Sequence, residues 1–150
     1  MSKVQQKVLL MSSTSISCLF CDDVRQEKSG KNTLVGVYND VIIFPQSAWD
    51  ENDSKAALTQ LYIANYFTGF PNGPTKIVWW IEDPDGTLFG MDEKKELEFE
   101  FSDSTHALLL RITPVIFSRV GQYRYSVKIN GFEYEKSLEI RLAESLEAVS

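Results

Sequence analysis

Few residues of this 150-residue chain could take part in metal, redox or acid–base chemistry, and two of them lie close together. Cys18 and Cys21 are the only cysteines, and they form a C-x-x-C pair in the stretch CLFCDD. Pairs with this spacing occur in zinc sites and in redox-active disulfides. A structural zinc ion needs about four ligands. The only histidine, His106, could supply one more, so the set would still need at least one carboxylate.

The residues around the two cysteines alternate in the manner of a β-strand, which argues against both chemistries. A redox C-x-x-C normally begins a helix, where the pKa of one thiol is lowered. Residues three apart on a strand point to opposite faces of the sheet, so Cys18 and Cys21 would not converge. We therefore predict two half-buried structural cysteines, with no metal and no cofactor.

The other candidates for catalysis or ion binding are isolated. His106 begins an apolar strand with no nucleophile motif nearby, so we predict that it is not a general base. Asp50 and Asn52 match the start of a calcium-binding EF-hand loop, but Leu61 stands where that loop needs a bidentate glutamate. The sequence favours a protein that is not an enzyme. A small-ligand site built around Cys21, His106 and nearby acids is an alternative.

The segment from Glu82 to Asp103 is strongly acidic. It contains nine acidic residues and two lysines, so its charge is −9 + 2 = −7. Glu96, Glu98 and Glu100 alternate with three apolar residues, which predicts an amphipathic strand with the glutamates facing water. They are candidate interface residues for a basic partner. The alternative is a solvated strand face that also discourages edge-to-edge aggregation.

Charges of both signs surround a predicted hairpin turn at Ser29–Gly30. Asp22, Arg25, Glu27 and Lys31 form this candidate polar cluster. Exposed cross-strand ion pairs explain it most simply, and each contributes only about 0–1 kcal/mol. If the group is buried, it could instead set the strand register or bind a polar ligand.

Two aromatic residues fall in polar, loop-like segments. Trp49 lies in the stretch from Gln46 to Gln60, and Phe70 lies in GFPNG. Exposed aromatic side chains in such loops are typical interface anchors, so both are candidate protein-interface residues. The alternative is that they fold back and cover an open end of the core.

Most of the chain has the period-two hydrophobicity of β-strands. We predict about eight strands and little helix; the stretch from Gln46 to Gln60 would hold either a short helix starting near Asp53 or Ser54 or only a loop. Asn130–Gly131 is a strong hairpin signal. The expected architecture is an all-β antiparallel sandwich. Residues 1–15 would be a flexible leader or edge strand, 16–142 a single domain and 143–150 a frayed tail.

Composition limits the classes of partner. The net charge of −6 disfavours binding to a nucleic-acid backbone, which needs lysine and arginine to displace counterions. No apolar run approaches the roughly 20 residues needed to span a bilayer. The apolar stretch from Val8 to Met11 is shorter than the core of an export signal. We therefore expect a cytoplasmic protein.

Gly121 and Tyr123 form a G-x-Y pattern before the last hairpin, in SRVGQYRYSVKINGFEYEKSLEIRL. With this pattern, the end of the chain resembles an immunoglobulin-like sandwich. The resemblance implies a tyrosine corner at Tyr123, with Tyr125 in the position of the second disulfide cysteine. A tryptophan of KIVWWIE would match the core tryptophan of that fold. The disulfide pair itself is absent.

A second resemblance covers the region from about Cys18 to Leu142. The stretch CDDVRQEKSGKNTLVGVY, together with the later WWIEDPDG, is similar to a family of short, uncharacterised bacterial proteins. This resemblance implies a bacterial or phage origin and supplies no catalytic residues. Together these observations predict a non-enzymatic protein-binding or adaptor domain, which could also pair with itself. A phage or mobile-element inhibitor of a bacterial defence protein, acting through the acidic strand, is the alternative.

Overall fold

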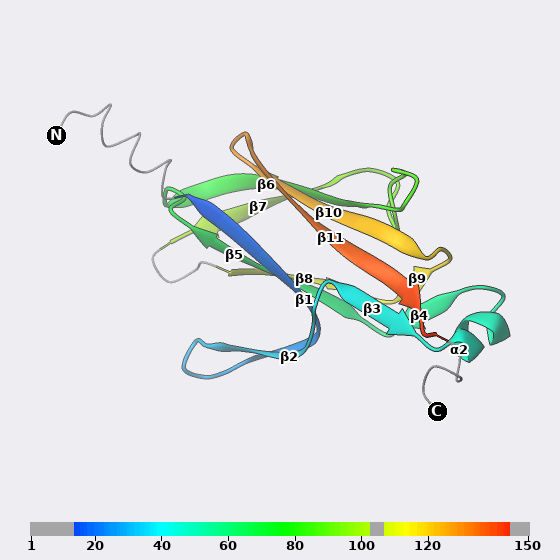
Figure 1. The fold of residues 1–150 in the computed structure, drawn as a ribbon. Helices are drawn as coiled ribbons and strands as arrows, with labels where there is room; N and C mark the ends of the chain where they lie inside the picture. Colours follow the sequence, from blue (N-terminus) through cyan, green and yellow to red (C-terminus); the bar gives the residue numbers. More distant parts are fainter. Residues whose placement is uncertain (1–13, 103–106, 145–150) are drawn as a thin grey trace.

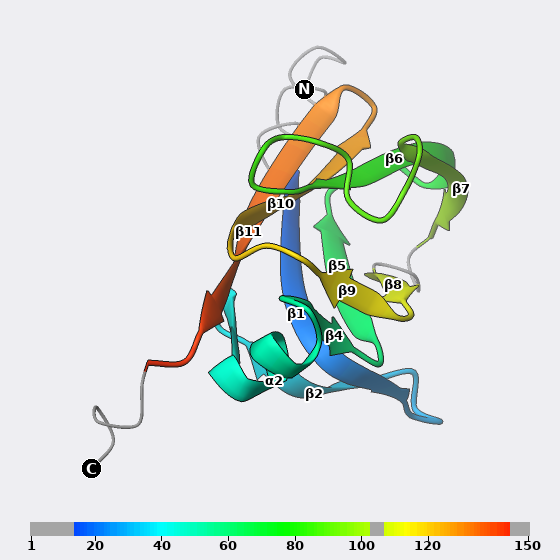
Figure 2. The same ribbon diagram turned by 90° about the vertical axis from the view of Figure 1, so that its right-hand side faces the viewer.

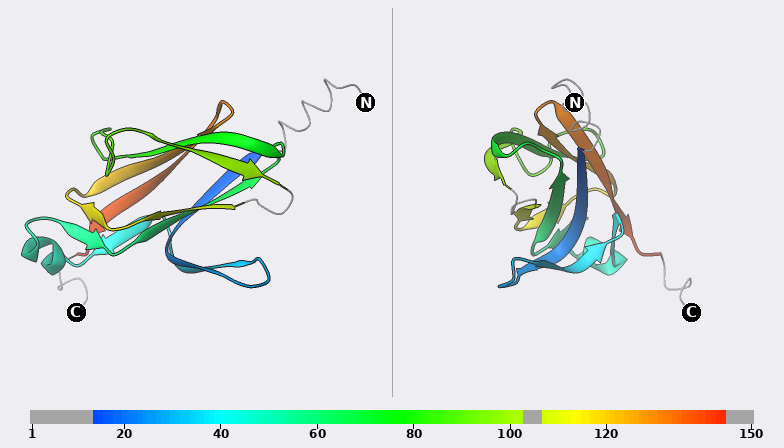
Figure 3. Two further views of the ribbon diagram at one scale, coloured as in Figure 1. Left: turned by 180° about the vertical axis from the view of Figure 1, so that it is seen from behind. Right: turned by 90° about the vertical axis from the view of Figure 1, so that its left-hand side faces the viewer.

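The computed structural model of the chain describes residues 14–102 and 107–144. Figures 1 and 3 show two layers of strands that face each other across one core. The first layer has the strand order β2-β1-β5-β8. It consists of β1 (Ser15–Gln26), β2 (Asn32–Tyr38), β5 (Leu61–Thr68) and β8 (Ala107–Ile112).

The second layer is a five-stranded sheet with the order β3-β11-β10-β6-β7. It consists of β3 (Val41–Phe44), β6 (Gly73–Glu82), β7 (Lys95–Phe101), β10 (Gly121–Ile129) and β11 (Phe132–Leu142). A small ladder and one helix complete the described part of the chain. They are β4 (Ala56–Leu58) paired with β9 (Val115–Phe117), and α2 (Gln46–Glu51). No helix among the described residues is long and apolar enough to cross a bilayer.

The predicted all-β sandwich is confirmed, with several differences in detail. Within the described residues, eleven strands form rather than about eight, because three short segments of three or four residues also pair. One pair, β3 with β11, is parallel. The predicted helix start is wrong: α2 begins directly after Pro45. Asp53 and Ser54 instead have left-handed backbones, with φ of 56° and 60°, and lead the chain out of the helix.

The strand order is that of an immunoglobulin-like sandwich. β1, β5 and β8 pair as strands A, B and E do, whereas β6, β10 and β11 pair as C, F and G do. The Tyr123 hydroxyl donates a hydrogen bond to the carbonyl oxygen of Arg119 over 2.8 Å. This is the geometry of a tyrosine corner at the start of strand F, so that prediction is confirmed. The β10–β11 hairpin turns at Asn130 and Gly131, both with positive φ, as predicted.

A hydrogen bond joins the two sheets where immunoglobulin domains have a disulfide. Tyr125 of β10 donates its hydroxyl to Oδ1 of Asn65 on β5 over 2.7 Å. The two side chains are 1% and 0% exposed. Trp79 of β6 packs against Tyr125 with ring centroids 6.3 Å apart, in the place of the core tryptophan. The link between the sheets is therefore polar and non-covalent.

Asn65 uses all of its polar groups in this buried position. Its Oδ1 also accepts a hydrogen bond from the Cys18 thiol of β1 over 3.0 Å. Its Nδ2 donates to the carbonyl oxygens of Leu108 on β8, at 3.0 Å, and of Ile63, at 3.3 Å. A buried amide is stable only when it is satisfied in this way. One side chain thus holds β1, β5 and β8 together and connects them to β10.

We predict that this network contributes measurably to stability. Tyr125→Phe should lower the free energy of unfolding by about 1 kcal/mol, because one buried hydrogen bond is lost. Asn65→Ala should cost roughly 3 kcal/mol, since it leaves the Tyr125 hydroxyl and the Cys18 thiol without their acceptor and opens a cavity. Urea denaturation followed by circular dichroism measures both changes.

A matched control is Tyr62→Phe, on the outer face of the same strand as Asn65. Its hydroxyl does not join the network, so the expected change is within about 0.5 kcal/mol. Equal effects of Tyr62→Phe and Tyr125→Phe would contradict a special role for the link between the sheets.

Candidate functional site

The loop Asp83–Lys94 between β6 and β7 shapes the outer surface of the five-stranded sheet. It starts with a tight turn, in which the Gly86 amide donates to the carbonyl oxygen of Asp83 over 2.9 Å. Further along, Phe89 enters the core: its ring stacks on Phe117 at 5.4 Å and meets Tyr123 edge-on at 4.9 Å. Phe89 therefore anchors the loop between the two sheets.

A hollow of about 370 Å³ lies between this loop and the outer face of the sheet. Trp80 is only 6% exposed there, and the Lys94 ammonium lies 3.8 Å from the centre of its ring. The indole Nε1 donates to Oε1 of Glu82 over 3.1 Å. The residues that line the hollow are Trp80, Glu82, Gly86, Leu88, Lys94, Arg124, Glu133 and Glu135.

Ser126 lies beside this hollow with an unused polar group. In the sheet register it stands opposite Trp80 on β6 and Glu135 on β11, so its side chain is on the same outer face. It is fully buried, and its hydroxyl has no hydrogen-bond partner within residues 14–102 and 107–144. A buried hydroxyl left unpaired costs about 1–3 kcal/mol, so the surface is not optimised for stability alone.

The charges of this face are predominantly negative. Three glutamates line the hollow against two cations, and one of those cations, Arg124, has its Nη2 3.5 Å from Oε2 of Glu82. The acidic row of β7 extends the face. It consists of the exposed residues Glu96, Glu98 and Glu100. Lys76 pairs with Glu96 at 3.1 Å, but both are mostly exposed and contribute only about 0–1 kcal/mol.

The predicted amphipathic pattern of β7 is confirmed. Its three glutamates are exposed, whereas Leu97 and Phe99 are partly buried and Phe101 is buried. The register sets the glutamates opposite Val78, Lys76 and Pro74 of β6. They therefore share the outer face with Trp80 and belong to the same surface as the hollow.

Trp49 and Phe70 lie far from each other. Trp49 belongs to α2, and Phe70 to the β5–β6 connection at the opposite end of the sandwich (Figure 1). Both are partly buried and pack against the core. Phe70 stacks on Phe101 with centroids 5.4 Å apart and meets Phe67 edge-on at 5.9 Å. Their contacts are those of side chains that cover the ends of the core.

The four residues of the candidate polar cluster do not come together. Asp22 accepts a hydrogen bond from Tyr38 and packs against Gly36, where a Cβ would collide with its carboxylate. Arg25, Glu27 and Lys31 lie further along the hairpin and are exposed. Glu27 accepts a hydrogen bond from Thr33 over 3.2 Å.

The two cysteines are free and almost completely buried, rather than half-buried as expected. Cys18 pairs with Asn65 and Cys21 with Tyr62 in the register, so the side chains point to opposite faces of the sheet. Burial raises the pKa of Cys18 from the usual 9.0 to about 12 and also raises the pKa of Cys21. The described residues contain no group of three or more histidines, cysteines or acids that could hold a metal. His106 and Asp103 lie outside them.

The hollow around Trp80 was missed by sequence reasoning. Its residues come from β6, β10, β11 and the loop after β6, so they are distant in the chain. Adjacent tryptophans on a strand lie on opposite faces of the sheet, but the sequence of KIVWWIE does not show which face each one occupies. Only the pairing of Trp80 with Ser126, and of Ser126 with Glu135, brings the charged residues around the ring.

Comparisons with known proteins give limited information. No protein-family model matches the sequence, and a search of the curated proteins finds no match. Among solved structures, the chain is similar to a crystal structure of an immunoglobulin-like protein from Pseudomonas aeruginosa. The identity is 15%, the match covers 85% of this chain and 96% of the other, and the TM-score is 0.42. The assignment to the immunoglobulin-like class rests on the strand order and the tyrosine corner of the chain itself.

The buried thiols generate a prediction about reactivity. At pH 8, a thiol with a pKa of about 12 is ionised in roughly one molecule in 10,000. Native protein should therefore react with Ellman's reagent far more slowly than denatured protein, in which two thiols become available. Rapid labelling of the native chain would contradict the burial of the cysteines.

The same shift makes stability depend on alkaline pH. The unfolded thiol releases its proton near pH 9, whereas native Cys18 holds it to about pH 12. Its contribution is thus fully present below pH 9 and is lost as the pH rises towards 12. Urea denaturation at several pH values should show a smaller loss of stability for Cys18→Ala than for the wild type over this range.

Proposed function

We propose that the chain is a non-enzymatic protein-binding domain. It would bind a basic side chain of a partner protein in the hollow around Trp80. One observation supports this more than any other: the hollow already accommodates a cation, since the Lys94 ammonium lies 3.8 Å from the centre of the Trp80 ring. A tryptophan face flanked by carboxylates is a favourable environment for lysine or arginine.

The internal cation comes from a residue that a partner can replace. Lys94 is exposed and is the last residue of the loop, directly before β7. A cation–π contact at an exposed site contributes only about 0.5–1 kcal/mol. An arginine from a partner would stack on the same ring and present five donors to Glu82, Glu133 and Glu135. The partner's side chain would therefore make more contacts than Lys94 does.

The acidic row of β7 supports the same class of partner. Glu96, Glu98 and Glu100 lie on the same outer face and would attract a basic surface over longer distances. Inhibition of a defence protein by imitation of nucleic-acid phosphates would use this face too. Lys76, which pairs with Glu96, interrupts the row of negative charge. This interruption favours a specific protein contact over imitation of nucleic-acid phosphates.

Peptides selected from a random display library provide a defined probe for this surface. We expect peptides that bind the wild type to be enriched in arginine and lysine. Glu133→Lys combined with Glu135→Lys should weaken their binding at least about tenfold, because the carboxylates that pair with them are replaced by like charges. Biolayer interferometry measures the affinities.

The matched control places the same charge change elsewhere. Glu27→Lys combined with Glu51→Lys alters the net charge equally, from −6 to −6 + 4 = −2, on the hairpin and on α2. This variant should bind the peptides with an affinity within about threefold of the wild type, because distant charges change only the screened long-range attraction. Peptides without basic residues, or equal losses in both variants, would refute the proposed site.

Removal of Lys94 tests whether its ammonium competes with a partner's basic side chain for the Trp80 ring. Lys94→Ala should strengthen binding of the selected peptides about threefold, since the ring is then free. Lys28→Ala, on the β1–β2 hairpin, removes the same charge at a distance and should have little effect. Equal strengthening by both substitutions would indicate an effect of net charge only.

A further inference from the structure

The sandwich is open along the side where its two edge strands lie. β7 ends one sheet and β8 ends the other, and no strand bridges them in the described part of the chain. Figure 2 shows both strands on the same side of the molecule. A space of about 500 Å³ lies on this side, between the end of β6 with the loop that follows it and the segment from Arg111 to Ile116. Its apolar walls include Trp79, Ile81, Phe89, Met91, Ile112 and Ile116.

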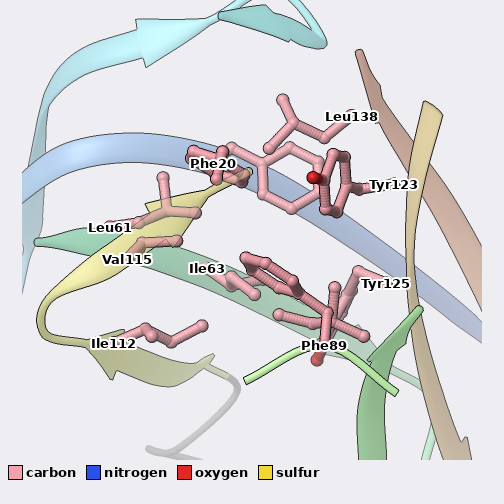
Figure 4. A pocket seen from close by; sticks show the side chains of 11 residues that line it. Phe20, Leu61, Ile63, Phe89, Ile112, Val115, Tyr123, Tyr125 and Leu138 are labelled. Carbon is pink, nitrogen blue, oxygen red and sulfur yellow. The ribbon is translucent and has the colours of Figure 1, made fainter. Parts of the chain in front are cut away.

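The opening shares part of its lining with a small cavity in the core. This cavity, of about 20 Å³, lies deeper between the sheets and is lined by eleven apolar or aromatic side chains (Figure 4). Ile81, Phe89, Ile112 and Val115 line both spaces. An apolar void of this size stays dry. The cavity is only about the size of one water molecule, so an apolar chain would be accommodated by the opening itself.

Two cations stand at the rim of this apolar space. Lys95 is opposite Trp79 in the register, and Trp79 faces Tyr125 in the interior, so Lys95 lies on the inner side of β7. Arg111 of β8 also lines the opening, but it is opposite Tyr62 in the register, so its side chain belongs to the outer face of its sheet, where its Nε donates to Oε1 of Gln60 over 3.0 Å. Neither cation forms an ion pair with any residue in 14–102 or 107–144.

These charges contrast with the rest of the molecule. The chain carries a net charge of −6, yet the lining of the opening includes two basic residues and no acidic one. A space of 500 Å³ is within the roughly 300–1,000 Å³ typical of small-molecule sites, which combine apolar walls with a few polar groups. The combination fits an amphiphile with an apolar chain and a single negative head.

We propose that this opening binds a free, single-chain fatty acid. The acyl chain would lie between the sheets against Ile81, Phe89 and Ile112, and each buried methylene would contribute about 0.8 kcal/mol. The carboxylate would bind Lys95 at the rim through a charge-assisted hydrogen bond, and Arg111, whose side chain is on the outer face of β8, would add attraction over a longer distance. This site is separate from the hollow proposed for a protein partner, because Trp79 and Trp80 face opposite sides of the sheet.

Isothermal titration calorimetry of the full chain with dodecanoate, below its micelle concentration, tests the proposal. We expect saturable binding of one molecule per chain. Dodecanol should bind at least about tenfold more weakly, and dodecyltrimethylammonium more weakly still, because the rim is positive. Equal binding of the three amphiphiles, or no saturable binding of dodecanoate, would overturn the proposal.

Adjacent lysines provide the matched variants. Lys95→Gln should weaken dodecanoate binding about tenfold, whereas Lys94→Gln, whose side chain lies over Trp80 on the outer face, should leave it within about twofold. Ile116→Glu adds a negative charge at the rim on a residue that is 52% exposed, so the fold should tolerate it. It too should weaken binding about tenfold, and unchanged binding in both Lys95→Gln and Ile116→Glu would refute the site.

The variants also separate this proposal from the proposed protein contact. Glu133→Lys combined with Glu135→Lys should leave dodecanoate binding within about twofold, because these residues line only the outer hollow. Conversely, Lys95→Gln should not alter the preference of selected peptides for basic residues. Either site can thus be disproved while the other stands.

Discussion

The hydrogen bond between Tyr125 and Asn65 is the constraint on which the rest of the sandwich depends. It ties the two sheets together at their centre, where neither side chain reaches water. A disulfide at this position would act largely by restricting the unfolded chain. The hydrogen bond acts only in the folded state, and it requires that every polar atom of Asn65 find a partner. The positions of β1, β5, β8 and β10 are therefore specified by one amide.

The structural elements that could be predicted from the sequence are those set by local pattern. The alternation around Glu98, the turn at Asn130 and the tyrosine corner at Tyr123 each depend on a few neighbouring residues, and all three are confirmed. The role of Asn65 could not be predicted, since nothing near it in the chain indicates that Tyr125 lies opposite. The parallel pairing of β3 with β11 also joins segments that are distant in the chain, so no local pattern could predict it.

Among the candidate surfaces too, only the one set by local pattern could be predicted from the sequence. The acidic row of β7 was predicted from its alternation, whereas the Trp80 hollow and the apolar opening are assembled from several strands and one loop. The loop Asp83–Lys94 contributes to both: Phe89 lines the opening, while Lys94 lies over Trp80. Adjacent residues on β6 and β7 therefore belong to different surfaces, and a reading of the sequence alone cannot assign them without the strand register.

The alternation in β7 also decides how that strand is aligned. An edge strand has only one neighbour, so its alignment depends on fewer contacts than that of a central strand. A shift of one residue along β6 would turn Phe99 and Phe101 out to water and carry three carboxylates between the sheets. Desolvating those charges would cost far more than any backbone hydrogen bond regained. The glutamates thus exclude the misaligned pairing, irrespective of what their surface binds.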